Sequence, residues 1–469
     1  MREGVLDTSS VLVVSAADRA TARKADAAVH AEVARLAKVL SSWQQDSELA
    51  RIVAAGRGVP SAELAEVLRL ALDWRTQSGG AFEPGLAALG QRWNKAAEAG
   101  AEPSAEELAI AVAALRDAPF AFHGDEVVCR GLVTLDALAK GWIVDRAAAA
   151  VADVPGAQLV SFQIGGDMRL GRAPRAIALA DPRQPADNAP PLCTVLVGDA
   201  AVASSGGYKR GPTVAGARHS HILDPRTGRP ADSVLGCSVL APDAATADAL
   251  ATSLCVLGPV DGFALLARTP GAHAVLVTAD GAVHESPGFA AHKQPEPPPK
   301  AAPARAAAWP DGFGLQIDFT IVAPASAGRG RGGWKRPYVA VWIEDATGAP
   351  AKTLALWIDD RKWLRDLRRW TRATADQRGL ADLVSSATRK AGEYTLTWDG
   401  CDDDGRQLAP GRYVVCIEAA REHGTHQLMR QEIDLVTEPQ SVAIADNEEI
   451  SEAKLTFGKL GKAAKAAAK

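Results

Sequence analysis

Cysteine and aromatic residues are scarce in this chain. Aromatic residues make up 5% of its 469 residues, and the six cysteines contain no CxxC pair, which argues against a disulfide scaffold and a zinc site. No stretch approaches the roughly 18 consecutive apolar residues of a membrane span, so we expect no membrane-spanning segment. The net charge of -4 offers no basic surplus for nucleic acid, and we expect no nucleic-acid partner.

What the chain does contain is the composition of a soluble protein, 47% hydrophobic and 23% charged. At about 100–200 residues per domain, its length predicts two or three domains. A Pro/Ala-rich stretch divides it, and seven of the eleven tryptophans follow that stretch, so the two parts are not copies of each other. We predict a first domain over 1–288, a linker over 289–308, a second domain over 309–440 and a Lys/Ala-rich, solvated tail over 441–469.

The first part mixes helical and strand patterns, which predicts an α+β fold. Helical periodicity covers residues 17–39 and 61–77, with Ser61 as N-cap. A further helix is predicted from Asp243 as N-cap to a terminator at Gly258. The second part is dominated by short strand patterns such as YVAVWIED and GRYVVCIEAA, which favours a mostly-β domain, an Ig-like sandwich.

Two segments of the first part suggest phosphate or ligand binding. In TLDALAKGWIVDR a helix begins near Lys140, and backbone N–H groups beside a lysine suit a phosphate. An exposed lysine at an ordinary helix start is the alternative. In QIGGDMRLGR, Gly165 and Gly166 follow a strand and would let a ligand approach the backbone, although such glycines also simply form turns.

Two other segments carry polar groups that suit catalysis. ASSGGYKRG and RHSHILDPRTGRP place His219 and His221 before a turn, where they could be metal ligands, a general base, or part of a polar surface hairpin. TADALATS places Asp248 and Thr252 at i and i+4 on one helical face. Their oxygens suit Mg²⁺, and the alternative is a pair of surface or capping groups.

Together these segments resemble one family. The succession SGGAFEP, LDALAKGWIVDR, IGGD, SSGGYKR, HSHILDPRTG and DALATS is similar to the FAD:protein FMN transferases of the ApbE type, from about Val5 to Gly288. The resemblance implies an enzyme that uses FAD as substrate together with Mg²⁺. It moves FMN onto a Thr or Ser hydroxyl of an acceptor protein and releases AMP.

The resemblance also implies roles for individual residues. His221 would be the catalytic base, and Lys140 would lie near the diphosphate. The metal would be held by the side chains of Asp248 and Thr252 and by the backbone carbonyls of Ala137 and Ala251. The residues implied to bind FAD are Ser78, Gly79, Gly80, Lys140, Gly165, Gly166, Asp167, Ser205, Gly206 and Tyr208.

Three positions depart from the family pattern. Asp136 adds a carboxylate near the implied metal, Gln163 replaces an asparagine before the paired glycines, and residues 6–8 (Leu-Asp-Thr) stand where Met-Gly-Thr is common. These departures leave open a non-catalytic flavin-binding or electron-carrier protein. By resemblance we expect a periplasmic or other extracytoplasmic location. The chain opens MREGVLDTSS, with no apolar signal core, so any export signal was removed or never existed.

The second part resembles the uncharacterised domain often found behind ApbE-type transferases. It could dock a membrane redox partner, or it could carry the acceptor. Residues 382–388 (DLVSSAT) fit the acceptor pattern of such enzymes, which makes Thr388 a candidate site of covalent FMN. Trp363 and Trp370 would then stack on the attached ring. The acceptor is therefore either this chain itself or a periplasmic redox partner with such a motif.

Overall fold

The computed structural model divides the chain into two compact units, one of residues 1–183 and 193–294 and one of residues 184–192 and 295–469. Their placement relative to each other is not determined. The structure describes residues 2–6, 8–184, 186, 188–207, 211–294, 309–310, 312–323, 336–358, 361–375, 385–386, 388–403, 406–421, 424–436 and 438–460. The Pro-rich part of the predicted linker, 295–308, lies outside these residues.

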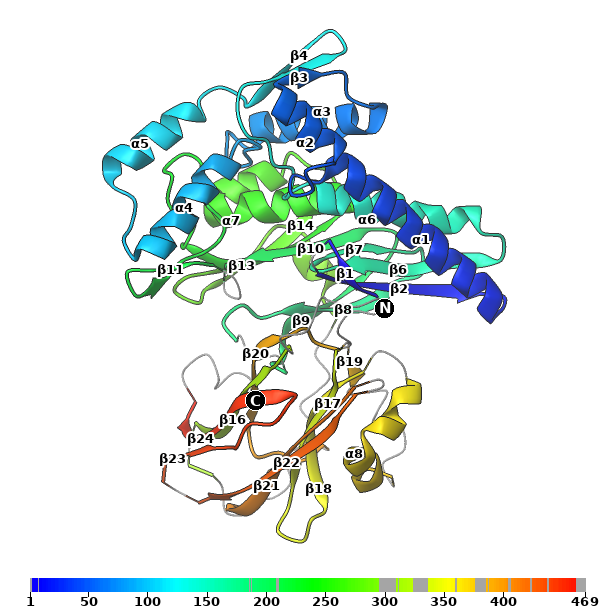
Figure 1. Ribbon diagram of the computed structural model, residues 1–469, viewed down its shortest axis with the longest axis vertical. Helices are drawn as coiled ribbons and strands as arrows, with labels where there is room; N and C mark the ends of the chain where they lie inside the picture. Colours follow the sequence, from blue (N-terminus) through cyan, green and yellow to red (C-terminus); the bar gives the residue numbers. More distant parts are fainter. Residues whose placement is uncertain are drawn as a thin grey trace. The chain divides into compact units, whose positions relative to one another are not determined.

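The first unit is built on an eight-stranded antiparallel sheet (Figure 1). In spatial order its strands are β1 (Arg2–Val5), β2 (Thr8–Ala16), β6 (Ala157–Ile164), β7 (Asp167–Leu170), β10 (Ala201–Gly206), β13 (Val234–Ala241), β14 (His273–Thr278) and β15 (Val283–Glu285). The inner strands β13 and β14 carry nearly continuous apolar runs that are buried along most of their length, as expected of strands inside a core. Small sheets are formed by β3 (Arg57–Gly58), β5 (Glu126–Cys129) and β4 (Phe120–His123), by β8 (Arg175–Ala180) and β9 (Pro191–Val197), and by β11 (Thr213–Val214) and β12 (Ala217–Arg218).

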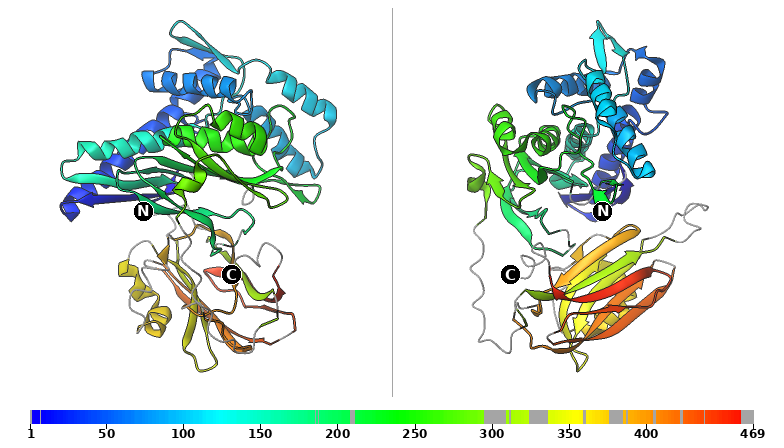
Figure 2. Two further views of the ribbon diagram at one scale, coloured as in Figure 1. Left: turned by 180° about the vertical axis from the view of Figure 1, so that it is seen from behind. Right: turned by 90° about the vertical axis from the view of Figure 1, so that its left-hand side faces the viewer.

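Helices cover one face of this sheet, and the views from front and back agree on that arrangement (Figure 2). Two predicted helices are confirmed. One is α1, which begins after the N-cap Asp18, and the other is α3, whose N-cap Ser61 accepts the Leu64 N–H. The helices are α1 (Arg19–Leu40), α2 (Glu48–Ala55), α3 (Ala62–Gln77), α4 (Ala87–Ala99), α5 (Ala105–Ala114), α6 (Ala139–Ala149) and α7 (Ala244–Leu266), with 3₁₀ turns η1 (Ala150–Asp153) and η2 (Phe289–His292).

Helix α7 is the central helix of the unit. Asp243 caps it as predicted, and Gly258 interrupts it with a left-handed φ of 72°, after which Pro259 starts a second helical stretch. By length and composition alone α7 is long and apolar enough to cross a membrane, although no such segment is expected from the sequence. However, 61% of its most apolar stretch is buried inside the unit. This burial is typical of a core helix.

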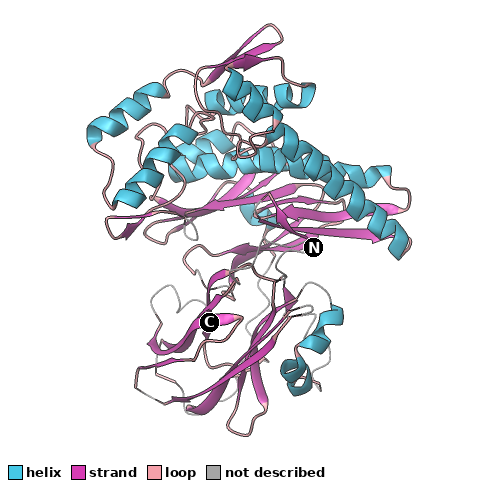
Figure 3. Cartoon of the chain, viewed as in Figure 1, coloured by secondary structure: helices cyan, strands magenta, loops and turns pink. Residues whose placement is uncertain are grey.

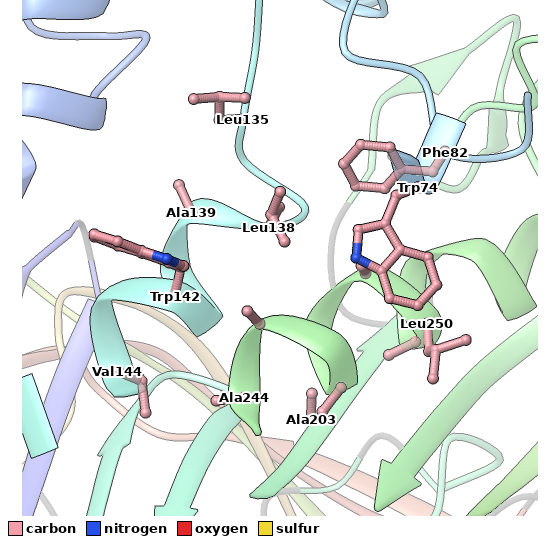
Figure 4. Packing of buried hydrophobic residues seen from close by; sticks show 14 of the residues in the cluster. Trp74, Phe82, Leu135, Leu138, Ala139, Trp142, Val144, Ala203, Ala244 and Leu250 are labelled. Atoms are coloured by element: carbon pink, nitrogen blue, oxygen red, sulfur yellow. The ribbon is translucent and has the colours of Figure 1, made fainter. Parts of the chain in front are cut away.

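One continuous core joins the helices to the sheet. Figure 4 shows Trp74 and Phe82 side by side near Leu250 of α7, with Leu138 at the start of α6. Burial of these large side chains fixes α3, α6 and α7 against the strands. The elements that carry the candidate site residues therefore rest on a single packed core.

The second unit is mostly β, as predicted, and α8 (Arg368–Ala373) is the single α-helix in the described part of it (Figure 3). Two sheets contribute side chains to one core. The first contains β20 (Gly392–Trp398), β16 (Phe313–Ile321), β24 (Ile450–Lys459) and β23 (Gln440–Ala443). The second contains β19 (Ser385–Ser386), β18 (Pro350–Trp357), β17 (Tyr338–Glu344), β21 (Gly411–Ala420) and β22 (His426–Leu435).

Strands β23 and β24 correct the prediction of a solvated tail from residue 441. Strand β24 is central in its sheet, and Leu455 and Phe457 are fully buried. Lys454 alternates with them toward solvent, and Lys459 is exposed at the last position of the strand, so these lysines belong to a strand and not to a solvated tail. The second unit thus extends at least to Leu460, and residues 461–469 lie outside the described part.

A smaller apolar cluster packs on the outer face of the five-stranded sheet. It is covered by the 3₁₀ helix η3 (Arg361–Asp366) and by α8. Trp363 stacks on Tyr338, and the buried Trp370 donates its indole N–H to the Thr353 hydroxyl at 3.2 Å. Both tryptophans therefore pack on their own unit, and their stacking on an attached flavin ring stays a prediction.

Candidate functional site

The predicted phosphate lysine lies at the start of α6 and forms an ion pair. Lys140 Nζ is 2.6 Å from Asp167 Oδ2 on β7. The Asp167 side chain is 2% exposed, whereas that of Lys140 is 31% exposed. The buried carboxylate thus holds a lysine whose head still reaches solvent, where it could meet an anionic ligand.

The next residue of α6 connects to the candidate metal helix. The backbone N–H of Gly141 donates to Asp248 Oδ2 on α7 at 3.2 Å, and Asp248 is 2% exposed. Burial raises the pKa of the Asp248 carboxyl, Lys140 and the Gly141 N–H lower it, and Asp136 adds to the rise. A carboxylate so deeply buried is costly unless a cation or hydrogen-bond donors compensate it.

One turn further along α7, Thr252 meets the end of strand β10. Its Oγ1 lies 3.4 Å from Ser205 Oγ. On the same strand, the hydroxyls of Ser204 and of Ser238 on β13 are hydrogen-bonded, with their oxygens 2.8 Å apart. The predicted FAD loop at Ser205 and the predicted metal helix therefore come together, although they are far apart in sequence.

The paired glycines lie between β6 and β7, beside the same strand. A Cβ on Gly166 would lie 2.8 Å from the Ser204 carbonyl oxygen, so a larger residue cannot occupy this position without movement. Gly165 has a left-handed φ of 58°, and a Cβ there would lie 3.2 Å from Thr8. The N-terminal segment therefore reaches the glycines even though its sequence departs from the family pattern.

Ser78, Gly79 and Gly80 form the turn that ends α3. Ser78 is buried, and its hydroxyl accepts the Phe82 N–H at 2.9 Å. The Thr134 N–H donates to the Pro84 carbonyl at 2.8 Å, which ties this turn to the segment leading into α6. The described contacts thus place the turn near the Lys140 segment but do not join its three predicted residues to Lys140 directly.

The histidine loop lies between β12 and β13 against the end of β10. A Cβ on Gly207 would overlap the Ser220 hydroxyl, so the loop packs on the glycines that follow Ser205. His221 is exposed on this loop. His219 is different: it lies 3.2 Å from an Asp232 oxygen and packs against Trp93 with ring centroids 5.5 Å apart.

Asp136, which departs from the family pattern, is held by contacts with residues that lie before α2. Its carboxylate accepts the Ser42 hydroxyl at 2.9 Å and the Trp43 indole N–H at 3.1 Å. Asp136 is exposed, and the Trp43 side chain is 78% exposed. Asp136 therefore anchors the segment between α1 and α2, while its charge still raises the pKa of Asp248.

Other predicted residues have simpler placements. Ala137 lies just before α6, Ala251 is buried within α7, and Gly206 ends β10. Tyr208 lies outside the described residues. Among the described residues, no group of three His, Cys, Asp or Glu side chains gathers to hold a metal.

Sequence reasoning missed two carboxylates beside the site. Asp232 contacts His219 and also accepts the Ser220 N–H at 2.9 Å. Asp145 on α6 accepts the N–H groups of Ala244 and Ala245 at 2.9 and 3.0 Å. Each acts across a tertiary contact, so no spacing in the sequence could have indicated it.

Comparison with known proteins decides the relationship. The ApbE family profile matches residues 6–277, more than half of the chain. This chain belongs to the ApbE family. The sequence elements quoted for the resemblance fall within that match, and the expected family is confirmed.

Several ApbE-family relatives carry a functional name. The FAD:protein FMN transferase of Treponema pallidum is 32% identical over 277 residues, covering 54% of this chain and 76% of that protein. The one of Vibrio cholerae is 31% identical over 243 residues, covering 48% and 71%. The crystal structure of the ApbE protein of Thermotoga maritima aligns with a TM-score of 0.57 at 27% identity, covering 63% of this chain and 99% of that one.

The second unit matches a different family. A profile described as "Predicted periplasmic protein (DUF2271)" matches residues 328–452. This match supports an extracytoplasmic location for such domains and agrees with the expected domain behind the transferase. The match ends at residue 452, within the first residues of β24.

Proposed function

We propose that this protein transfers FMN from FAD onto a Thr or Ser hydroxyl of a protein and releases AMP. The observation that carries the proposal is that α6, which bears Lys140, contacts Asp248 of α7 through Gly141, while Thr252 of α7 contacts Ser205 of β10, in an ApbE-family chain. A non-catalytic flavin carrier is not favoured, because the buried carboxylate of Asp248 is retained at a cost that simple flavin storage does not explain.

Mg²⁺ is the metal that fits the residues present. The proposed ligands are the Asp248 carboxylate, the Thr252 hydroxyl and the carbonyls of Ala137 and Ala251, which are hard oxygen donors of the kind Mg²⁺ prefers. Asp248 is the only acidic side chain in this proposed set, so the set differs from a cluster of three or more His, Cys, Asp or Glu side chains. When bound, the ion would supply neutralisation of the diphosphate charge.

The other residues perform the proton and positioning steps. The acceptor oxygen attacks the phosphorus of the FMN half, the bond to the AMP oxygen breaks, and AMP leaves with that oxygen. His221 takes the hydroxyl proton from its exposed position on the loop. Lys140, held by Asp167, positions the diphosphate, and Ser205, with the glycines at 165, 166 and 206, lines the FAD.

Thr388 is our candidate acceptor within the chain. It is 5% exposed and follows the two-residue strand β19, which pairs with β18 at only two positions. The Arg389 guanidinium lies 5.2 Å from the Trp357 ring centre beside it. Modification therefore requires this short edge to open, and pairing of two residues is a small barrier to opening. Other residues of the motif (382–384 and 387) lie outside the described part.

A single incubation tests this function. The full chain is mixed with FAD and Mg²⁺, and AMP release and peptide masses are measured. We expect AMP and one added FMN on the peptide containing Thr388, with no added mass in Thr388→Ala and retained modification in Thr388→Ser. A bare Thr388 beside a modified separate protein would contradict self-modification and leave the transferase intact. No AMP with any acceptor would contradict both.

The finer assignments follow from this function. We propose an Ig-like sandwich for the second unit, because its two sheets share one core. We also propose a periplasmic location for the whole chain, in keeping with the description of the DUF2271 family. The acceptor, if not this chain, would be a redox protein of the same compartment.

A further inference from the structure

Helices α6 and α7 are joined by two polar contacts one turn apart. Gly141 of α6 bonds to Asp248 of α7, and Asp145 of α6 bonds to Ala244 and Ala245 of α7. Residue numbers rise along α6 as they fall along α7, so the helices run antiparallel across this contact. Gly141 and Asp145 are i and i+4 and therefore share the face of α6 turned toward α7.

The helices could not approach so closely with another residue at 141. A Cβ on Gly141 would overlap the carbonyl of Ala244, which is backbone and cannot rotate away. The close approach in turn brings the Gly141 N–H within reach of Asp248 Oδ2. The spacing of the helices thus decides whether the buried carboxylate keeps its backbone donor.

Asp145 occupies a position that ordinary helix capping does not require. Helix α7 already has an N-cap, since Asp243 accepts the Thr246 N–H at 2.7 Å. Asp145 instead binds the first two N–H groups of α7 from another helix, one with each carboxylate oxygen. These donors have no partner within α7 itself, so Asp145 attaches the start of that helix to α6.

We propose that Asp145 is a positioning residue for the transfer reaction, which sets the spacing of α6 and α7 and thereby the placement of Asp248 relative to Lys140. It touches neither FAD nor the acceptor and acts through α7. This inference rests on the proposed function, because it assigns Asp145 to the geometry of the proposed metal site. Outer residues that orient metal ligands typically change metal affinity about 10–100-fold when replaced.

The charged groups around Asp145 are Asp243 at the α7 N-cap and Arg169 on β7. Burial raises the pKa of the Asp145 carboxyl to about 6, the Ala244 and Ala245 N–H groups lower it, Asp243 raises it and Arg169 lowers it. Arg169 is itself bonded to the Pro242 carbonyl and to Asp199. Above its pKa the carboxylate accepts both N–H groups, whereas its protonated form accepts less well.

The test compares Asp145→Asn with Asp243→Asn in the full chain. Both variants remove a negative charge that lies beside the first turn of α7. Only Asp145→Asn weakens the contact between α6 and α7, because Asp243 belongs to the α7 cap. We expect Asp145→Asn to raise the Mg²⁺ concentration needed for half-maximal FAD binding and AMP release about 10-fold, and Asp243→Asn to change it less than about 3-fold. At saturating FAD, the change should lie in metal dependence rather than in KM for FAD.

A measurement without metal or substrate accompanies this comparison. Hydrogen exchange of the Gly141 N–H in the metal-free chain should speed up in Asp145→Asn but not in Asp243→Asn, because only the first lets the helices separate. Gly141→Ala keeps the Asp145 carboxylate and forces the helices apart, so it should reproduce the altered Mg²⁺ dependence even where Asp145→Asn folds poorly.

Two results would overturn the inference. If Asp145→Asn keeps the wild-type Mg²⁺ dependence and Gly141 exchange, or if both Asn variants shift them equally, Asp145 is only a cap. These outcomes leave the proposed function standing, because the wild type would still bind FAD and release AMP with Mg²⁺. A wild type that shows neither would overturn the function and this inference together.

Discussion

The Lys140 ammonium lies 2.6 Å from the Asp167 carboxylate, and of the two side chains only that of Lys140 reaches solvent to an appreciable extent. The pair links α6 to β7 at the point where the paired glycines turn the chain. A buried carboxylate that holds a half-exposed lysine both supports the fold and presents a positive charge to a ligand.

Replacement of Lys140 separates these two roles. Lys140→Met leaves the Asp167 carboxylate buried without its cation, and we expect the free energy of unfolding to fall by about 3 kcal/mol. The double variant Lys140→Met/Asp167→Asn should recover most of that loss in urea denaturation but not AMP release, since the lysine charge is still missing. AMP release by the double variant at the wild-type rate would show that the Lys140 charge is not required for the reaction.

Asp248→Asn should abolish Mg²⁺-dependent turnover, by at least about 100-fold, because the one proposed carboxylate ligand loses its charge. The fold should survive, since burial disfavours the charge that is removed. Asp243→Asn is the matched control on the same helix: because asparagine caps helices about as well as aspartate, it should change stability little and keep turnover. Wild-type turnover in EDTA would argue against the metal site.

His221→Ala should slow transfer by about 10²–10⁴-fold with nearly unchanged FAD affinity, and the loss should shrink as pH rises and more acceptor alkoxide forms. The comparison variant is His219→Ala, which breaks the contact with Asp232 and should lower loop stability without that pH dependence. Single-turnover rates and flavin fluorescence separate the two effects. An equal loss of FAD binding in His221→Ala would assign His221 to structure.

Asp145 should also make stability depend on pH. Its folded pKa is raised from 3.8 to about 6, so between these values the folded chain holds a proton that the unfolded chain has released. Stability therefore falls as pH rises through this window, relative to Asp145→Asn, which does not titrate. Melting temperatures at pH 4 and above pH 6 should show the variant gaining on the wild type. A constant difference would contradict the raised pKa.

Elements with signals at their own ends were predictable from the sequence. Ser61 caps α3, Asp243 caps α7, and Gly258, with a positive φ of 72°, breaks the helix where a terminator is predicted. A cap acts within one turn of chain, so the local residues decide it. The family blocks likewise contain the residues at Lys140 and Asp248, which the fold brings together through α6 and α7.

Elements defined by distant partners were not predictable. In β24 the apolar alternation is broken at Glu452, whose φ is 54°, and Lys454 lies among polar and small residues on the outer face, so the strand resembles a polar tail. The contact of Asp145 with Ala244 joins residues 99 apart. Neither the strand β24 nor the Asp145 contact follows from local sequence spacing. Each forms only when the neighbouring strand or helix is folded.

The near-complete burial of Thr388 sets an order of events. If Thr388 is the acceptor, as proposed, its hydroxyl is out of reach while β19 is paired, so folding of the second unit and attachment of flavin would compete for the same few residues. If flavin were attached before folding, β19 would have to pair with β18 while a bulky phosphodiester lies beside Trp357 and Arg389. If folding came first, attachment would have to wait until β19 transiently separates from β18. The rate of flavin attachment would then measure how often a short parallel strand comes loose, and it should respond to anything that tightens β18.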